Sequence, residues 1–213
     1  MTKKCIFFDL DGTLTDSGPG IMNCAIAVFQ HYGLPIPEPA QLRTMVGPPL
    51  RESFPRFGVP VDQVENAIAI YRLHYNATGK FENTPYPGIP ELLQKLKSDG
   101  HRLFVATSKP EHMSIEILEH FGLASYFEHI CGSMLDGVRD KKADVIAYLL
   151  ERIGSAENVI MVGDTVFDVL GANEHQIPTI AVGWGYGDHE DMKNAGAIAL
   201  ATDTQALYSM LSK

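Results

Sequence analysis

Short apolar runs alternate with helical patterns along most of this chain, and this alternation limits the possible folds more than any other feature. Each apolar run is bounded by polar or turn residues, and apolar residues at helical spacing separate the later runs. Strands that alternate with helices in this way form parallel βαβ units, with helices on both faces of the sheet. The expected strands are residues 5–8, 103–106, 129–131, 159–162 and 179–182.

The interval 18–83 interrupts this alternation, because it contains no convincing strand pattern. Apolar residues at helical spacing indicate one amphipathic helix within 21–32 and another within 64–75. Seven prolines between these two helices limit the length of any helix there. We therefore expect an α/β core with a Rossmann-like parallel sheet, formed by residues 1–16 and 84–213. An all-helical cap, residues 17–83, is inserted into it, with linkers at 16–19 and 82–88.

The composition limits the function as well. The chain has 213 residues, of which 45% are hydrophobic and 20% charged, as in ordinary globular proteins. A formal net charge of −9 argues against a nucleic-acid polymer as partner, because phosphate backbones are bound by clustered lysine and arginine. No secretory signal or membrane-spanning stretch is recognisable, and the three cysteines lack a metal-ligand spacing. We expect a cytoplasmic protein with no membrane partner, either a monomer or a homodimer.

Polar residues that could carry chemistry follow four of the expected strands. In an open α/β sheet the ligand crevice lies beyond the carboxyl ends of the strands, so these residues should converge. They are Asp9 and Asp11 after the first strand, Thr107 and Ser108 after the second, Lys142 beyond the third, and Asp164 and Asp168 after the fourth.

The carboxylates in this set indicate a magnesium site. Asp9, Asp164 and Asp168 would repel one another strongly without a cation, and Mg²⁺ prefers oxygen ligands of this kind. If a helix begins near Thr165, the four-residue spacing of Asp164 and Asp168 places both on the side that faces the site. Lys142 would add the positive charge that a transferring phosphoryl group requires.

Phosphoryl transfer to Asp9 is the reaction that fits these residues. An aspartyl-phosphate intermediate divides a very slow hydrolysis into two easier steps. Asp11 would protonate the leaving alkoxide and then take a proton from the attacking water. Thr107 and Ser108 would offer donors to the phosphate oxygens, and the substrate would be a small phosphate monoester.

Three segments resemble motifs of one enzyme family. Residues 9–14 (DLDGTL) resemble the first motif of the haloacid dehalogenase (HAD) superfamily, residues 105–110 (VATSKP) its second, and residues 163–168 (GDTVFD) its fourth. The insertion after the first motif is similar to the helical C1-type cap of the phosphoglycolate phosphatase-like group. The resemblance therefore implies a Rossmann-like core that carries a helical cap.

The resemblance also implies roles for single residues. Asp9 would be the nucleophile and Asp11 the general acid and base. Mg²⁺ would be held by Asp9, by the backbone carbonyl of Asp11 and by Asp164, with Asp168 nearby or acting through water. These roles agree with the chemistry inferred from the residues alone.

The third motif of the superfamily contributes a lysine, and two adjacent lysines of this chain are candidates for it. Many relatives have lysine followed by proline, whereas here Lys141 and Lys142 precede Ala143. The distance to the apolar pair Val145 and Ile146 favours Lys142, and Lys141 stays the alternative.

A closer similarity concerns the substrate. Residues 46–50, 78–83, 132–133 and the pair Asp136 and Gly137 resemble a 5′-nucleotidase-like branch of the superfamily. Phosphoglycolate phosphatase is the first alternative. A sugar-phosphate mutase of the β-phosphoglucomutase type is the second, because such mutases share the aspartate pair and a helical cap.

The expected cap carries candidates for substrate recognition. Arg43 and Arg51 could bind a substrate carboxylate or a second phosphate. A nucleotide base would need an aromatic stacking surface. The candidates for that surface are Phe54, Tyr71, Tyr75 and, outside the cap, Trp184.

Overall fold

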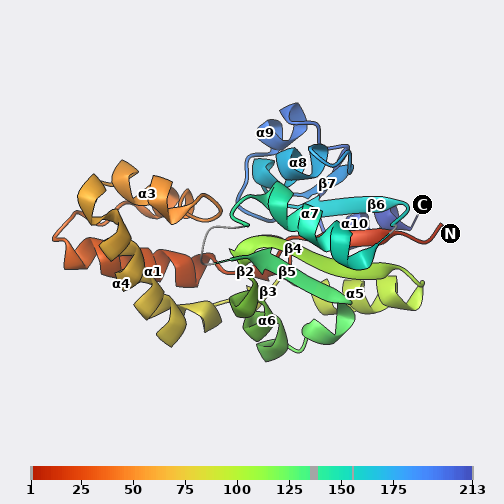
Figure 1. The fold of residues 1–213 in the computed structure, drawn as a ribbon, viewed down its shortest axis with the longest axis horizontal. Helices are drawn as coiled ribbons and strands as arrows, with labels where there is room; N and C mark the ends of the chain where they lie inside the picture. The colour runs from red at the N-terminus through yellow and green to blue at the C-terminus, as the bar shows by residue number, and fades with distance from the viewer. Residues whose placement is uncertain (1, 135–138, 155, 213) are drawn as a thin grey trace. The chain divides into compact units, whose positions relative to one another are not determined.

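A computed structural model describes residues 2–134, 139–154 and 156–212 of the chain (Figure 1). The chain forms two compact units, Met1–Thr15 with Pro85–Lys213, and Asp16–Thr84. The corresponding boundaries predicted from the sequence lie after residues 16 and 83. That the second unit acts as a cap stays a prediction.

The first unit is built on a six-stranded sheet with the strand order β5-β4-β1-β6-β7-β8. All of its pairings are parallel, which confirms the Rossmann-like α/β core predicted from the sequence. The strands are β1 (Cys5–Phe8), β4 (Arg102–Pro110), β5 (His129–Ser133), β6 (Val159–Gly163), β7 (Thr179–Val182) and β8 (Ala199–Ala201).

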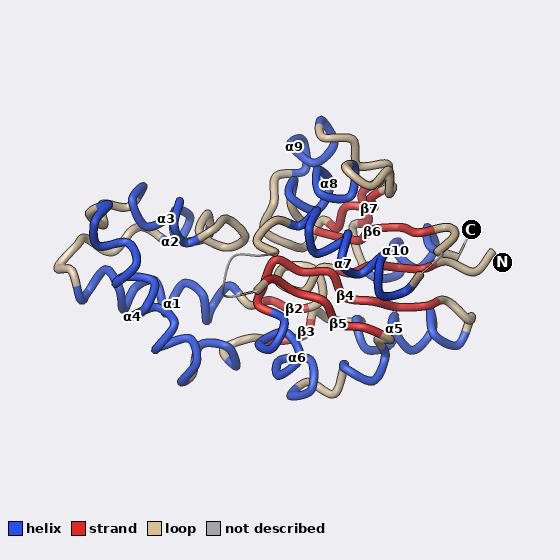
Figure 2. Tube along the Cα trace, viewed as in Figure 1, coloured by secondary structure: helices blue, strands red, loops and turns tan. Residues whose placement is uncertain are grey.

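Helices cover both faces of this sheet, because alternate residues of each buried strand point to opposite faces (Figure 2). In β1, Ile6 and Phe8 pack with the apolar residues of α5, α6 and α10. Cys5 and Phe7 pack on the other face, with those of α7 and α8. The helices of this unit are α5 (Ile89–Ser98), α6 (Glu111–His120), α7 (Lys142–Ile153), α8 (Val166–Asn173), α9 (His189–Asn194), α10 (Thr204–Leu211) and the 3-10 turn η3 (Ala124–Tyr126).

The second unit is helical and has an aromatic core. Phe29 and Phe54 are fully buried and meet edge to face, with ring centroids 6.2 Å apart. Tyr71 packs on Phe54 and stacks on Tyr75. The helices are α1 (Gly18–His31), α2 (Pro39–Arg43), α3 (Leu50–Arg56) and α4 (Val64–Ala77), with the 3-10 turns η1 (Val61–Gln63) and η2 (Gly79–Phe81).

The structure differs from the sequence expectations mainly in short elements. Two linker segments contain strands, β2 (Thr15–Asp16) and β3 (Thr84–Pro85), which form a two-stranded sheet, and α1 begins inside the expected first linker. Further elements that were not predicted are α2, α3, β8, α9 and α10, because elements this short give little periodicity. Strand β4 runs on to Pro110 with a register shift after Ala106.

Among the described residues, no helix is both long and apolar enough to cross a membrane.

Candidate active site

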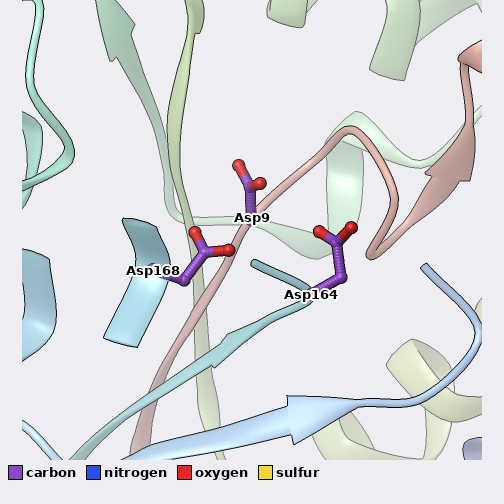
Figure 3. A group of neighbouring side chains, drawn as sticks. All are labelled: Asp9, Asp164 and Asp168. Carbon is purple, nitrogen blue, oxygen red and sulfur yellow. The ribbon is translucent and has the colours of Figure 1, made fainter. Parts of the chain in front are cut away.

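Three aspartates meet at the carboxyl end of the parallel sheet (Figure 3). Asp9 follows β1, Asp164 follows β6, and Asp168 lies in the first turn of α8. Each carboxylate offers one oxygen, and these three oxygens all lie within 4.8 Å of one another. Asp164 and Asp168 are fully buried and Asp9 nearly so. Buried carboxylates this close together are chemically suited to a hard cation such as Mg²⁺.

The start of α8 orients Asp168. Thr165 is the N-cap of the helix, and its backbone N–H and its hydroxyl both donate to Asp168 Oδ2, at 3.0 and 2.9 Å. This arrangement corresponds to a capping box, with aspartate in the third helical position. Asp168 Oδ1 therefore points away from the cap and toward the other carboxylates.

A close approach of two loops holds Asp164. The Thr13 hydroxyl donates to Asp164 Oδ1 at 3.0 Å, and the Tyr186 backbone N–H donates to Oδ2 at 2.9 Å. Gly12 has a φ of +83°, which favours glycine, and a Cβ there would lie 2.1 Å from Asp164 Oδ2. The glycine of the DLDGTL segment therefore makes room for this carboxylate.

Lys142 joins two of the aspartates. It is the first residue of α7, and its Nζ lies 2.7 Å from Asp9 Oδ1, 2.7 Å from Asp168 Oδ1 and 3.0 Å from the Ala106 carbonyl. Its side chain is only 4% exposed. Lys141 is the N-cap of α7 and is exposed to solvent. The structure thus brings Lys142, and not Lys141, to the carboxylates.

Burial and charge shift the ionisation of this cluster. Burial raises the pKa of Asp9 to about 6, Lys142 opposes this shift, and Asp168 adds to it. Burial also raises the pKa of Asp164 well above its ordinary value, with further contributions from the charges of Asp168 and Asp9. Burial alone would lower the pKa of Lys142, but Asp168 and Asp9 outweigh it and raise the pKa. A single lysine does not neutralise three buried carboxylates, which leaves a demand for further positive charge.

Asp11 has a partner, Lys109, that was not predicted from the sequence. Lys109 Nζ lies 3.0 and 2.7 Å from the two carboxylate oxygens of Asp11, and both side chains are largely buried. The Asp11 carboxylate thus pairs with Lys109, and it does not belong to the group formed by Asp9, Asp164 and Asp168. Its position after β1 and the lysine of the TSK segment were visible in the sequence, but their contact spans 98 residues.

The two hydroxyl residues of β4 differ in burial. Thr107 is 2% exposed, and its hydroxyl accepts a hydrogen bond from the Lys109 N–H at 3.2 Å. A hydrogen bond with the Thr107 side chain opposes the rise in the pKa of Asp9, which places this hydroxyl beside the carboxylate. Ser108 is exposed.

Comparison with known proteins adds the family. The family model described as haloacid dehalogenase-like hydrolase matches residues 6–182. The chain belongs to this family of hydrolases. This finding confirms the resemblance drawn from the three segments that surround the carboxylates.

Relatives of this hydrolase carry several names. A 5′-nucleotidase of Pseudomonas aeruginosa is 38% identical over 208 residues, which cover 97% of this chain and 94% of the relative. A phosphoglycolate phosphatase of Caulobacter vibrioides is 31% identical, with coverage of 90% and 84%. The tyrosine-protein kinase PtkA of Mycobacterium tuberculosis is 44% identical over 87% of this chain, which spans only 64% of that relative's length. The solved structure of PtkA has a TM-score of 0.89, with 40% identity, and covers 100% of this chain and 99% of that chain.

The expected substrate residues of the second unit are placed as follows. Arg43 and Arg51 are exposed, and Arg51 forms a surface ion pair with Glu65 at 2.7 Å. Their role stays a prediction. The aromatic core of the unit buries Phe54, Tyr71 and Tyr75. The prediction that these rings offer a stacking surface to a nucleotide base is therefore wrong. Asp136 and Gly137, which contributed to the 5′-nucleotidase resemblance, lie outside the described residues.

The pKa of Asp9 predicts how the stability of the metal-free hydrolase changes with pH. Burial raises this pKa from 3.8 to about 6. Between about pH 4 and about pH 6 the folded chain therefore binds more protons at Asp9 than the unfolded chain does. We expect this group to lower the free energy of unfolding by about 2–3 kcal/mol as the pH rises through that window. Urea unfolding in EDTA across the window measures the change, and Asp9→Asn should remove the part of it that Asp9 contributes.

Added Mg²⁺ should oppose this pH dependence, because protons and the cation compete for the same carboxylates. We expect Mg²⁺ to raise the midpoint of unfolding more at about pH 8 than at about pH 5. In Asp164→Asn the cation should have little effect at either pH. Equal stabilisation of the unaltered chain at both pH values would contradict a cation site built from these carboxylates.

Proposed function

We propose that this hydrolase is a Mg²⁺-dependent phosphatase that acts through an aspartyl-phosphate on Asp9, with nucleoside 5′-monophosphates as its substrates. The observation that carries the proposal is the convergence of Asp9, Asp164 and Asp168 on one buried point, with Lys142 bridging two of them. This arrangement provides a nucleophile, a site for a cation and a fixed positive charge, which phosphoryl transfer requires.

Each half of the reaction would use Asp9 and Asp11 in turn. A carboxylate oxygen of Asp9 attacks phosphorus, the bond to the ester oxygen breaks, and Asp11 gives its proton to the departing alkoxide. A water then attacks the phosphorus of the aspartyl-phosphate and gives a proton to Asp11, and the bond from phosphorus to Asp9 breaks. Inorganic phosphate is released and both aspartates return to their starting states.

Other residues would prepare these steps. Lys142 balances the charge of Asp9 and would attract the oxygens of an incoming phosphate. Mg²⁺ would be held by Asp9, Asp164 and the backbone carbonyl of Asp11, with Asp168 beside it, and when bound it neutralises charge on the phosphoryl oxygens. The buried Thr107 hydroxyl next to Asp9 would donate to a phosphate oxygen, with Ser108 as a further candidate.

The pair of Asp11 and Lys109 adds a requirement to this mechanism. Lys109 contacts both oxygens of Asp11, at 3.0 and 2.7 Å. To protonate the alkoxide, Asp11 must first take up a proton, and the protonated oxygen must turn from the Lys109 ammonium group to the ester. A substrate phosphate offers Lys109 another anion, so substrate binding would favour that exchange.

Phosphate release from a substrate panel tests this proposal. With Mg²⁺ we expect the highest kcat/KM on nucleoside 5′-monophosphates, in line with the name of the Pseudomonas relative. The panel also contains phosphoglycolate and hexose phosphates. Preference for phosphoglycolate would favour the first alternative and direct attention to Arg43 and Arg51. Absence of release with every substrate, in Mg²⁺ and with a folded protein, would overturn the phosphatase proposal.

The mutase alternative predicts a different result on the same panel. A hexose phosphate would then phosphorylate Asp9 without net release of inorganic phosphate, and the sugar would leave as an isomer. Because the PtkA relatives are named tyrosine-protein kinases, the panel also includes transfer of a phosphoryl group from ATP to a tyrosine-containing peptide. Efficient transfer to the peptide, in place of hydrolysis, would make a kinase the better description.

A further inference from the structure

The loop after β7, residues 183–187 (GWGYG), has no part in the proposed chemistry, yet it surrounds one of the three carboxylates. It contains three glycines and Trp184, the single tryptophan of the chain. Its spacing lacks the pattern of a dinucleotide-binding loop. Its contacts with Asp164 point to another role.

Hydrogen bonds connect the loop to both oxygens of Asp164, to one directly and to the other through Thr13. The Tyr186 backbone N–H donates directly to Oδ2 at 2.9 Å. On the other side, Trp184 Nε1–H donates to the Thr13 carbonyl at 3.0 Å, and the Thr13 hydroxyl donates to Asp164 Oδ1 at 3.0 Å. The loop thus holds one oxygen itself and the other through Thr13, so the carboxylate cannot rotate without breaking one of these bonds.

Close packing of the loop glycines restricts Asp164 further. A Cβ at Gly185 would lie 2.2 Å from Asp164 Cβ, and one at Gly187 would lie 2.1 Å from the Asp164 carbonyl oxygen. Neither glycine has a positive φ, so space and not backbone conformation requires glycine at both positions. Gly183 differs, because the nearest atom to a Cβ there is the Ala201 carbonyl oxygen at 3.4 Å. The first glycine of the loop therefore tolerates a methyl group that the second does not.

We propose that residues 184–187 form a positioning loop, which fixes the carboxylate of Asp164 in the orientation that binds a divalent cation, and that Trp184 responds to the cation. This inference rests on the Mg²⁺ site of the proposed function. A carboxylate that is already oriented loses little freedom when it binds a cation, and loss of such outer partners typically lowers metal affinity by about 10–100-fold. The residues of the loop act through Asp164 and are therefore positioning residues.

Mg²⁺ titration of the metal-free full chain, without substrate, tests the inference. We compare Trp184→Phe, which keeps an aromatic ring but removes the N–H donor, with Gly185→Ala and with the matched control Gly183→Ala. Isothermal titration calorimetry should show Mg²⁺ binding weakened about 10-fold or more in the first two variants and unchanged in the control. Circular dichroism establishes that each variant is folded. If Gly185→Ala does not fold, the comparison of Trp184→Phe with Gly183→Ala is sufficient.

Tryptophan fluorescence supplies the second readout, because all tryptophan emission comes from Trp184. Mg²⁺ should change this emission at the concentrations found by calorimetry, and Asp164→Asn should abolish the change. Unchanged Mg²⁺ affinity in both Trp184→Phe and Gly185→Ala would overturn the proposed role of the loop, and so would equal weakening of Mg²⁺ binding in Gly183→Ala. Either result would leave the cation site itself in place. Absence of Mg²⁺ binding to the unaltered chain would overturn the cation site, and with it the proposed function.

Discussion

Asp9→Asn is expected to lower kcat for phosphate release by at least about 10⁴-fold, because an amide cannot replace the carboxylate that attacks phosphorus. The fold should survive, since asparagine has nearly the same shape as aspartate. Removal of one charge also relieves repulsion among buried carboxylates whose oxygens lie within 4.8 Å of one another. We expect the metal-free variant to unfold at the same or a higher temperature than the unaltered chain at neutral pH.

Two further measurements separate a nucleophile from a residue that only binds the cation. Mass spectrometry of the acid-quenched unaltered chain during turnover should find a phosphoryl group on the peptide that contains Asp9. Asp144→Asn, which alters an exposed carboxylate of α7 outside the cluster, should keep normal activity. Near-normal turnover of Asp9→Asn, or a phosphoryl group on a different residue, would contradict the covalent mechanism.

Lys142→Met is expected to destabilise the protein by about 3–5 kcal/mol and to lower kcat/KM by about 10²–10³-fold. The stability loss follows from burial, because the Lys142 side chain is 4% exposed and its ammonium group contacts both Asp9 and Asp168 at 2.7 Å. Without it these carboxylates remain buried with no lysine between them. The activity loss follows from the missing positive charge beside the phosphoryl group. Urea unfolding and phosphate release measure the two effects.

The neighbouring lysine supplies the matched control. Lys141 is exposed, so Lys141→Met should change the free energy of unfolding by less than about 0.5 kcal/mol and leave kcat/KM close to normal. Mg²⁺ should restore part of the stability of Lys142→Met, because the cation neutralises the same carboxylates. If Lys141→Met were the more damaging change, Lys141 would be the phosphate-binding lysine and the proposed role of Lys142 would be wrong.

The features predicted well from the sequence are those that depend on neighbours along the chain. The alternation of short apolar runs with helical patterns predicted the parallel core, because parallel strands are joined by helices that cover both faces of the sheet. Carboxylates directly after β1 and β6 were expected to meet, since the carboxyl ends of parallel strands share one edge of the sheet. Asp164 and Asp168 were expected to face the site together if a helix began near Thr165, and α8 begins at Val166. Short elements such as β8 escaped detection because three residues show little periodicity.

The sequence by itself therefore determined the fold class, the edge of the sheet where the site lies and most of the residues found there. Only the tertiary structure decided which of two adjacent lysines faces the carboxylates, because successive helical residues differ by about 100° in direction. It also paired Lys109 with Asp11 across 98 residues and Trp184 with Thr13 across 171. Contacts over such separations depend on how β4 and the loop after β7 pack beside β1. No local pattern records that packing, nor the packing of the helices of the second unit that buries Phe54, Tyr71 and Tyr75.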